Sequence, residues 1–173
     1  MEKAYNKRVM AGVVFIVLVA SGFFLEKMLL KPKTTVDVAD VEIKLHTGNS
    51  GVKMGASQNA LISALGAPKQ IAAYSLQANY KQGTVLNYNG AKFYFIHDKL
   101  TNFEITSHKF NVGLTGTHQY TAIGNKKADL PHFKIQDRIA LLDVTSEDST
   151  TDQYLEYDLN DNGAVTKISY SDY

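Results

Sequence analysis

The sequence predicts an α+β protein in which one or two short helices pack on an antiparallel β-meander, behind an N-terminal transmembrane helix. Three observations predict this class: an apolar run near the N-terminus, one capped helix pattern at residues 57–65, and later segments rich in Tyr, Phe, Val and Ile. β-Branched and aromatic residues are typical of strands, whereas an apolar face at helical spacing is typical of a helix. We expect one extracytoplasmic domain at residues 36–173.

The first element is an uncharged run of seventeen residues, Val9–Leu25, which follows a short basic leader at residues 1–8. At ~1.5 Å per residue, a helix over this run covers about 25 Å of a hydrocarbon core that is about 30 Å thick. We predict a single-pass signal-anchor at residues 9–30 and a linker at residues 31–35. Because the large polar part follows the anchor, we place that part outside the cytoplasmic membrane.

A cleaved signal peptide is the alternative interpretation of the same run. Val19-Ala20-Ser21 has the small residues of a cleavage site, but the apolar run exceeds the usual length of about 7–15 residues. Its length favours the anchor. Cleavage would instead release a secreted or periplasmic protein.

The composition excludes several kinds of site. The chain has no Cys, which excludes disulfides, thiolate catalysis, Cys-ligated metals and a lipid-modified N-terminal Cys. We expect no cofactor, and the five His residues lack the spacing of a helical metal-binding pair. The expected extracytoplasmic location argues against nucleic acid as a partner, and no catalytic motif predicts an enzyme.

The soluble part begins with alternating apolar residues over 36–45, which predict a strand. One clear helix follows at residues 57–65. Ser57 is a typical N-cap, Gly66 suits the left-handed position after the helix, and Pro68 prevents its continuation.

After this helix the pattern predicts mainly strands and tight turns. Strands are expected at residues 71–80, 84–88, 91–97, 100–107, 138–145, 153–159 and 164–170. The turns that join neighbouring strands are expected at Asn89-Gly90, Asp98-Lys99 and Asp161–Gly163. Between these groups, residues 125–130 predict a second short helix that ends at Pro131. The order of a helix followed by strands, twice, predicts two tandem repeats, residues 36–110 and 111–173, with chance similarity of two hairpins as the alternative.

The helix segment also resembles a known family. Gly55, Ser57, Leu61, Leu65, Gly66 and Pro68 fill the places of the helix motif in the SmpA/OmlA family, the small lipoproteins of outer-membrane β-barrel assembly. The doubled helix-then-meander unit is similar to the β-lactamase inhibitor protein fold. The resemblance implies a non-enzymatic binding module that faces the bacterial envelope. The missing lipidated Cys and the predicted membrane helix depart from the family pattern.

A calcium-loop pattern occurs near the C-terminus, where Asp158, Asn160 and Asn162 precede Gly163. The twelfth position of such a loop holds a bidentate Glu, and here it is Ser169. Both flanks alternate as strands rather than helices. We interpret the segment as a hairpin turn, and a weak calcium site is the alternative.

Aromatic residues on the predicted strands are the remaining candidates for a binding site. Phe93 and Phe95 share one face of their strand and predict core, whereas Tyr94 points to the other face. If Tyr88 and Tyr94 are both exposed opposite the core, they form a protein-binding patch. We therefore expect a membrane-anchored binding module or accessory subunit for an envelope or membrane protein. A secreted or periplasmic inhibitor or small-ligand carrier is the alternative.

Overall fold

The computed structural model describes residues 35–77, 80–115, 117, 119–130, 134–145 and 153–171. The chain divides into two units, Met1–Thr34 and Thr35–Tyr173, and only the second contains described residues. The predicted anchor at Val9–Leu25 and the predicted cleavage site at Ser21 lie outside the described residues. In the part of the chain that the structure describes, no helix is both long and apolar enough to cross a bilayer.

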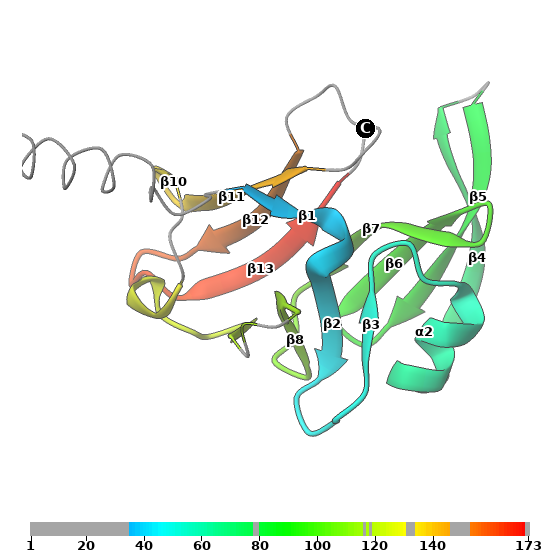
Figure 1. Ribbon diagram of the computed structural model, residues 1–173, viewed down its shortest axis with the longest axis horizontal. Helices are drawn as coiled ribbons and strands as arrows, with labels where there is room; N and C mark the ends of the chain where they lie inside the picture. The colour runs from blue at the N-terminus through cyan, green and yellow to red at the C-terminus, as the bar shows by residue number, and fades with distance from the viewer. Residues whose placement is uncertain are drawn as a thin grey trace, which may run out of the picture. The chain divides into compact units, whose positions relative to one another are not determined.

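Two sheets and one α-helix make up the described fold (Figure 1). The nine-stranded sheet has the order β1 (Thr35–Asp37), β11 (Ile139–Thr145), β12 (Gln153–Leu159), β13 (Val165–Tyr170), β7 (Lys99–Ile105), β6 (Ala91–Ile96), β5 (Tyr80–Tyr88) and β4 (Gln70–Gln77), and β10 (Lys134–Gln136) also pairs with β11. The four-stranded sheet has the order β3 (Gly51–Lys53), β2 (Val41–Leu45), β8 (Phe110–Leu114) and β9 (Tyr120–Ala122). The helical segments are α2 (Gln58–Leu65) and two 3-10 turns, η1 (Val38–Asp40) and η2 (Lys127–Asp129).

The predicted α+β class is wrong, because the described chain is mostly β and contains one α-helix. The larger sheet is also mixed rather than a plain antiparallel meander, since β1 runs parallel to β11. It joins both halves of the chain, because β13 pairs with β7. Among the described residues after β7 there is no second α-helix, only the 3-10 turn η2, so the helix-then-strands unit is not repeated there.

The second predicted helix, at residues 125–130, is only the single 3-10 turn η2. The backbone of this segment instead pairs with another segment in the manner of a strand. The N–H of Lys127 donates to the carbonyl of Gly163 at 2.8 Å, and Lys126 forms an isolated antiparallel bridge with Ala164. These contacts attach the segment to the turn between β12 and β13, and a continued helix would withdraw its backbone groups from them.

The helix predicted at residues 57–65 is confirmed. Ser57 Oγ accepts a hydrogen bond from the N–H of Ala60 at 3.2 Å, and Gly66 after the helix has φ 84°. Leu61 and Leu65 are buried on its inner side. Local capping chemistry therefore determines where α2 begins and ends.

Two of the three predicted turns are confirmed at their places. Gly90, with φ 80°, lies in the turn between β5 and β6, and Gly163, with φ 66°, lies in the turn between β12 and β13. The third turn is formed by His97 and Asp98, whose φ values are 50° and 60°, one residue earlier than predicted. Positive φ at both positions matches the twist of the flanking strands.

The core lies between the two sheets and α2. Phe93 and Phe95 of β6 are buried as predicted, and the Phe93 ring meets the edge of Phe110 from β8 at 6.0 Å between centroids. Figure 1 shows β2, β3 and β8 as a second layer beside the larger sheet, and α2 contacts β2 and β3. We call the side of the nine-stranded sheet that meets this layer its inner face. The opposite side is its outer face.

Candidate functional site

The outer face of the nine-stranded sheet carries a row of polar and aromatic side chains over β4 to β7. Register determines which residues share it. Tyr94 lies opposite Val85 of β5 and Asn102 of β7, and Lys92 lies opposite Glu104. Because neighbouring residues in register point to the same side of a sheet, these side chains all lie on the outer face.

Two tyrosine rings meet on this face. The ring centroids of Tyr74, from β4, and Tyr94, from β6, are 4.8 Å apart, with the planes inclined at 55°. Between them runs β5, where Gly83, the register partner of Tyr74, carries no side chain. A tilted aromatic pair at this distance is favourable beyond the area that it buries, by about 0.5–1.5 kcal/mol.

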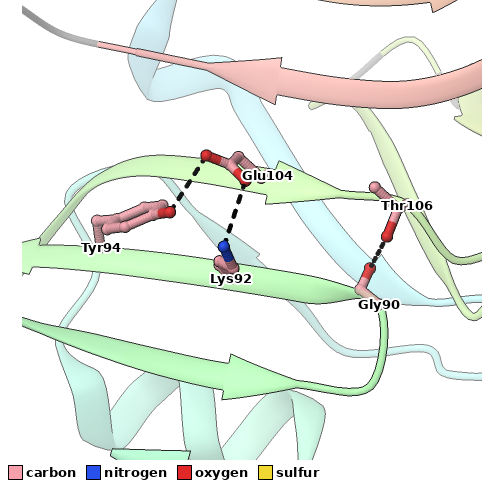
Figure 2. A network of polar contacts seen from close by, with 5 residues as sticks. All are labelled: Gly90, Lys92, Tyr94, Glu104 and Thr106. Atoms are coloured by element: carbon pink, nitrogen blue, oxygen red, sulfur yellow. Dashed lines mark hydrogen bonds and ion pairs between the residues drawn. The ribbon is translucent and has the colours of Figure 1, made fainter. Parts of the chain in front are cut away.

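Tyr94 is also held through its hydroxyl, as Figure 2 shows. The hydroxyl donates to Glu104 Oε1 at 3.2 Å, and Lys92 Nζ lies 4.0 Å from Glu104 Oε2. The Lys92 and Glu104 side chains are 54% and 47% exposed, so the ion pair itself contributes little to stability. Just beyond the ends of these strands, Thr106 Oγ1 donates to the carbonyl of Gly90 at 3.4 Å. The network therefore orients Tyr94 rather than stabilising the fold.

The environment of Tyr94 keeps its hydroxyl protonated. Burial, and then the charge and hydrogen bond of Glu104, raise the pKa of Tyr94 from 10.0 to about 12. A neighbouring carboxylate disfavours a phenolate because both groups would be negative. At neutral pH Tyr94 therefore acts as a hydrogen-bond donor with an apolar ring.

A shallow hollow of about 300 Å³ lies at the turn end of β5 and β6. It is lined by Asn87, Tyr88, Gly90, Ala91, Lys92, Glu104 and Thr106. Lys92 and Glu104 thus border both the hollow and the tyrosine pair. Hydroxyl, carboxylate and ammonium groups gather at this end of the outer face.

The structure does not bring Tyr88 and Tyr94 together on one face. Tyr88 points to the inner face, where its ring meets the rings of Phe93 and Phe110 at 5.5 and 6.1 Å between centroids. Its hydroxyl donates to the carbonyl of Gly66, after α2, at 2.7 Å. Tyr88 therefore joins α2 to the sheet, and Tyr74 takes the place beside Tyr94 that the sequence hypothesis gave to Tyr88.

Sequence reasoning missed Tyr74 although it placed this residue in a strand. The Tyr74–Tyr94 contact spans two strand pairings, β4 with β5 and β5 with β6. The Asn89-Gly90 turn indicates the second register, but no comparable turn signal indicates the first. The signal that was available is the alternation of side-chain faces, counted back from Gly83 in β5 to Tyr74 in β4.

The predicted calcium-loop residues are engaged within the chain. Asp158 lies 3.0 Å from Lys167 Nζ, and Asn160 Oδ1 accepts the N–H groups of Asn162 and Ala164, both at 3.0 Å. Among the described residues, no group of three or more His, Asp or Glu is placed to hold a metal ion. The segment has the geometry of a hairpin turn closed by an Asn side chain.

Comparisons with known proteins do not identify a family. No family profile matches the sequence, and no curated protein matches it. One solved structure is similar, an extracellular protein containing a SCP domain from Bacillus anthracis str. Ames, with a TM-score of 0.38 and 16% sequence identity. The match covers 69% of this chain and 44% of that chain, so it spans less than half of the other protein. The resemblance to the SmpA/OmlA family stays a prediction.

Proposed function

We propose that this chain is a membrane-anchored, envelope-facing binding module without catalytic activity, which presents its outer face to a protein partner. The observation that carries the proposal is the Tyr74–Tyr94 ring pair on the outer face, beside the Lys92 and Glu104 side chains, which are about half exposed. Tyrosine is common at the centres of protein interfaces. Its ring offers a large contact area with few rotatable bonds, and its hydroxyl remains a polar group.

The arrangement favours binding because Tyr94 is already ordered. Its ring is held by Tyr74 and its hydroxyl by Glu104, so binding costs little further side-chain entropy. Lys92 and Glu104 place both signs of charge beside the rings. The partner that fits has an apolar or aromatic contact for the two rings, bordered by polar groups that pair with Lys92 and Glu104.

The sequence supports the location of this module. An apolar run at Val9–Leu25 behind a basic leader is typical of a single-pass anchor in the bacterial cytoplasmic membrane. An anchor confines both the module and an envelope partner to the neighbourhood of one membrane. That confinement raises their effective concentration and makes a surface of modest area sufficient.

The test uses site-specific photo-cross-linking of the full-length chain in its own membranes. The photoreactive amino acid p-benzoylphenylalanine replaces Tyr94, and in a matched control it replaces Tyr120, a half-buried tyrosine on the four-stranded sheet. We expect a discrete protein adduct from position 94 and none from position 120. Absence of an adduct at position 94, with the protein folded in the membrane, would contradict the proposal.

Affinity then measures the contribution of the ring pair. With the cross-linked partner purified, the double variant Tyr74→Ala/Tyr94→Ala should bind at least about tenfold more weakly than the wild type, as for a central hot spot. Tyr120→Ala should bind unchanged. If the chain is instead recovered in the soluble fraction, shortened near Ser21, a secreted inhibitor or carrier replaces the anchored module. The hollow at Lys92 and Glu104 is then the first place to look for a small ligand.

A further inference from the structure

The strand β4 forms one edge of the nine-stranded sheet. It pairs with β5 from Gln70 to Gln77, and no described strand pairs with its other side. In an antiparallel strand, alternate N–H and C=O groups point away from the neighbouring strand. Such an edge is a template for a further strand.

This edge differs from the other edges of the described sheets. Strands β1, β3, β9 and β10 have three residues each, and Asp37, Lys53 and Lys134 place a charge in three of them. Strand β4 has eight residues, with no charged residue and no Pro. Short strands, charges and prolines are the usual means by which proteins prevent edge pairing, and β4 has none of them.

An apolar side chain is exposed on the same strand. Ile71 is 57% exposed, more than the other large hydrophobic residues found exposed in the described chain, Ile135 and Ile139. Its neighbour on the same face of β4, Ala73, is also exposed and is small enough to let a second strand approach. A strand added at this edge would cover Ile71 and would also form hydrogen bonds with the backbone groups of β4 that point away from β5.

We propose that β4 pairs antiparallel with β4 of a second copy of this chain, so that two nine-stranded sheets join edge to edge. A twofold axis makes both contributions identical and closes the assembly at two copies. Self-pairing also suits this sequence. The strand is uncharged, so its reversed copy brings no like charges together. The chain itself therefore supplies a compatible strand at equal concentration.

The faces of the sheets restrict the register of this pair. A twofold axis perpendicular to the sheet keeps inner face beside inner face, so residues of equal parity meet. Pairing about Ala73 places Ile71 opposite Ser75 and leaves Lys69 opposite Gln77 rather than opposite its own copy. The outer faces also become continuous, which brings the two copies of Tyr74 to one surface.

The first experiment uses the absence of Cys from the sequence. Ala73→Cys gives the full-length chain one thiol, and a short bismaleimide is applied in native membranes. The matched control is Ile135→Cys, on the strand β10 at the opposite edge of the same sheet and 41% exposed. We expect a covalent dimer from Ala73→Cys and little from Ile135→Cys. Equal yields from the two positions, or an adduct of Ala73→Cys with a different protein instead of its copy, would overturn the proposal.

The second experiment exchanges charge at the same position. Ala73→Lys and Ala73→Glu each place like charges across the twofold axis, and each should reduce the dimer at least tenfold in detergent-solubilised full-length protein measured by sedimentation. Both should keep the circular dichroism spectrum of the wild type, because Ala73 is exposed. When the two variants are co-expressed, opposite charges meet and a mixed dimer should return. A wild-type chain that sediments as a monomer, or variants that fail to form the mixed dimer, would disprove self-pairing through β4.

Discussion

Tyr88 and Tyr94 belong to one hairpin, yet they point to opposite faces of the nine-stranded sheet. Tyr88 lies opposite Ala91 across the turn, and both point to the core. Tyr94 is an odd number of residues beyond Ala91, so its side chain is on the outer face. The hairpin thus places one tyrosine against the core and the other, half-buried, on the outer face.

Tyr88→Phe should lower the free energy of unfolding by about 1 kcal/mol. The change keeps the ring contacts but removes the 2.7 Å hydrogen bond that the hydroxyl donates to Gly66. Urea unfolding of the full-length chain in detergent measures the loss. In the control Tyr94→Phe, water replaces the hydroxyl beside the half-exposed Glu104, so the change should stay within about 0.5 kcal/mol. Equal losses in both variants would contradict this assignment.

Glu104→Gln should lower the pKa of Tyr94 from about 12, because the neutral amide removes the nearby negative charge while burial remains. The raised value favours neutral tyrosine in the folded protein. Its contribution to stability is full below pH 10 and is lost as the pH rises through about 12. A ¹³C NMR titration of labelled tyrosine measures both variants. Tyr88, whose pKa of about 12 comes from burial alone, should not change between them.

The features predicted from the sequence are those that short segments determine by themselves. Helix α2 depends on Ser57 and Gly66 at its own ends, and the hairpin turns depend on residues such as Gly90 that adopt positive φ. The pairing of β13 with β7 joins segments about sixty residues apart, so no turn signal indicates it. The mixed sheet and the single helix follow from such distant pairings.

Only one of the two tyrosines of the candidate site could be predicted, again because distant strand pairings leave no local signal in the sequence. Alternation along β6 indicates that Tyr94 points away from Phe93 and Phe95, and the structure confirms this. The neighbour of Tyr94 depends on strand order and register. These place Tyr74 beside Tyr94 and place Tyr88 on the inner face. Local periodicity indicates on which face of the sheet a side chain lies, but not which side chains of the adjacent strands lie next to it.

Gly83→Ala should lower the free energy of unfolding by about 1–3 kcal/mol. A Cβ atom at this position would collide with the carbonyl oxygen of Phe95 and would lie 2.7 Å from Ile96 Cδ1. The backbone of β5 must therefore move away from β6, which also disturbs the contact between Tyr74 and Tyr94 that crosses β5. Thermal unfolding followed by near-ultraviolet circular dichroism reports both effects. An unchanged midpoint and an unchanged tyrosine signal would show that the two strands lie farther apart here.

Calcium should leave the midpoint of thermal unfolding unchanged, whereas Asn160→Ala should lower the free energy of unfolding by about 1 kcal/mol. Asn160 Oδ1 already accepts the N–H groups of Asn162 and Ala164, and Lys167 Nζ lies 3.0 Å from Asp158. A cation would have to displace these hydrogen bonds and approach an ammonium group. The measurement is differential scanning calorimetry with millimolar calcium and then with a chelator. A midpoint that rises with calcium in the wild type but not in Asn160→Ala would instead establish the turn as a cation site.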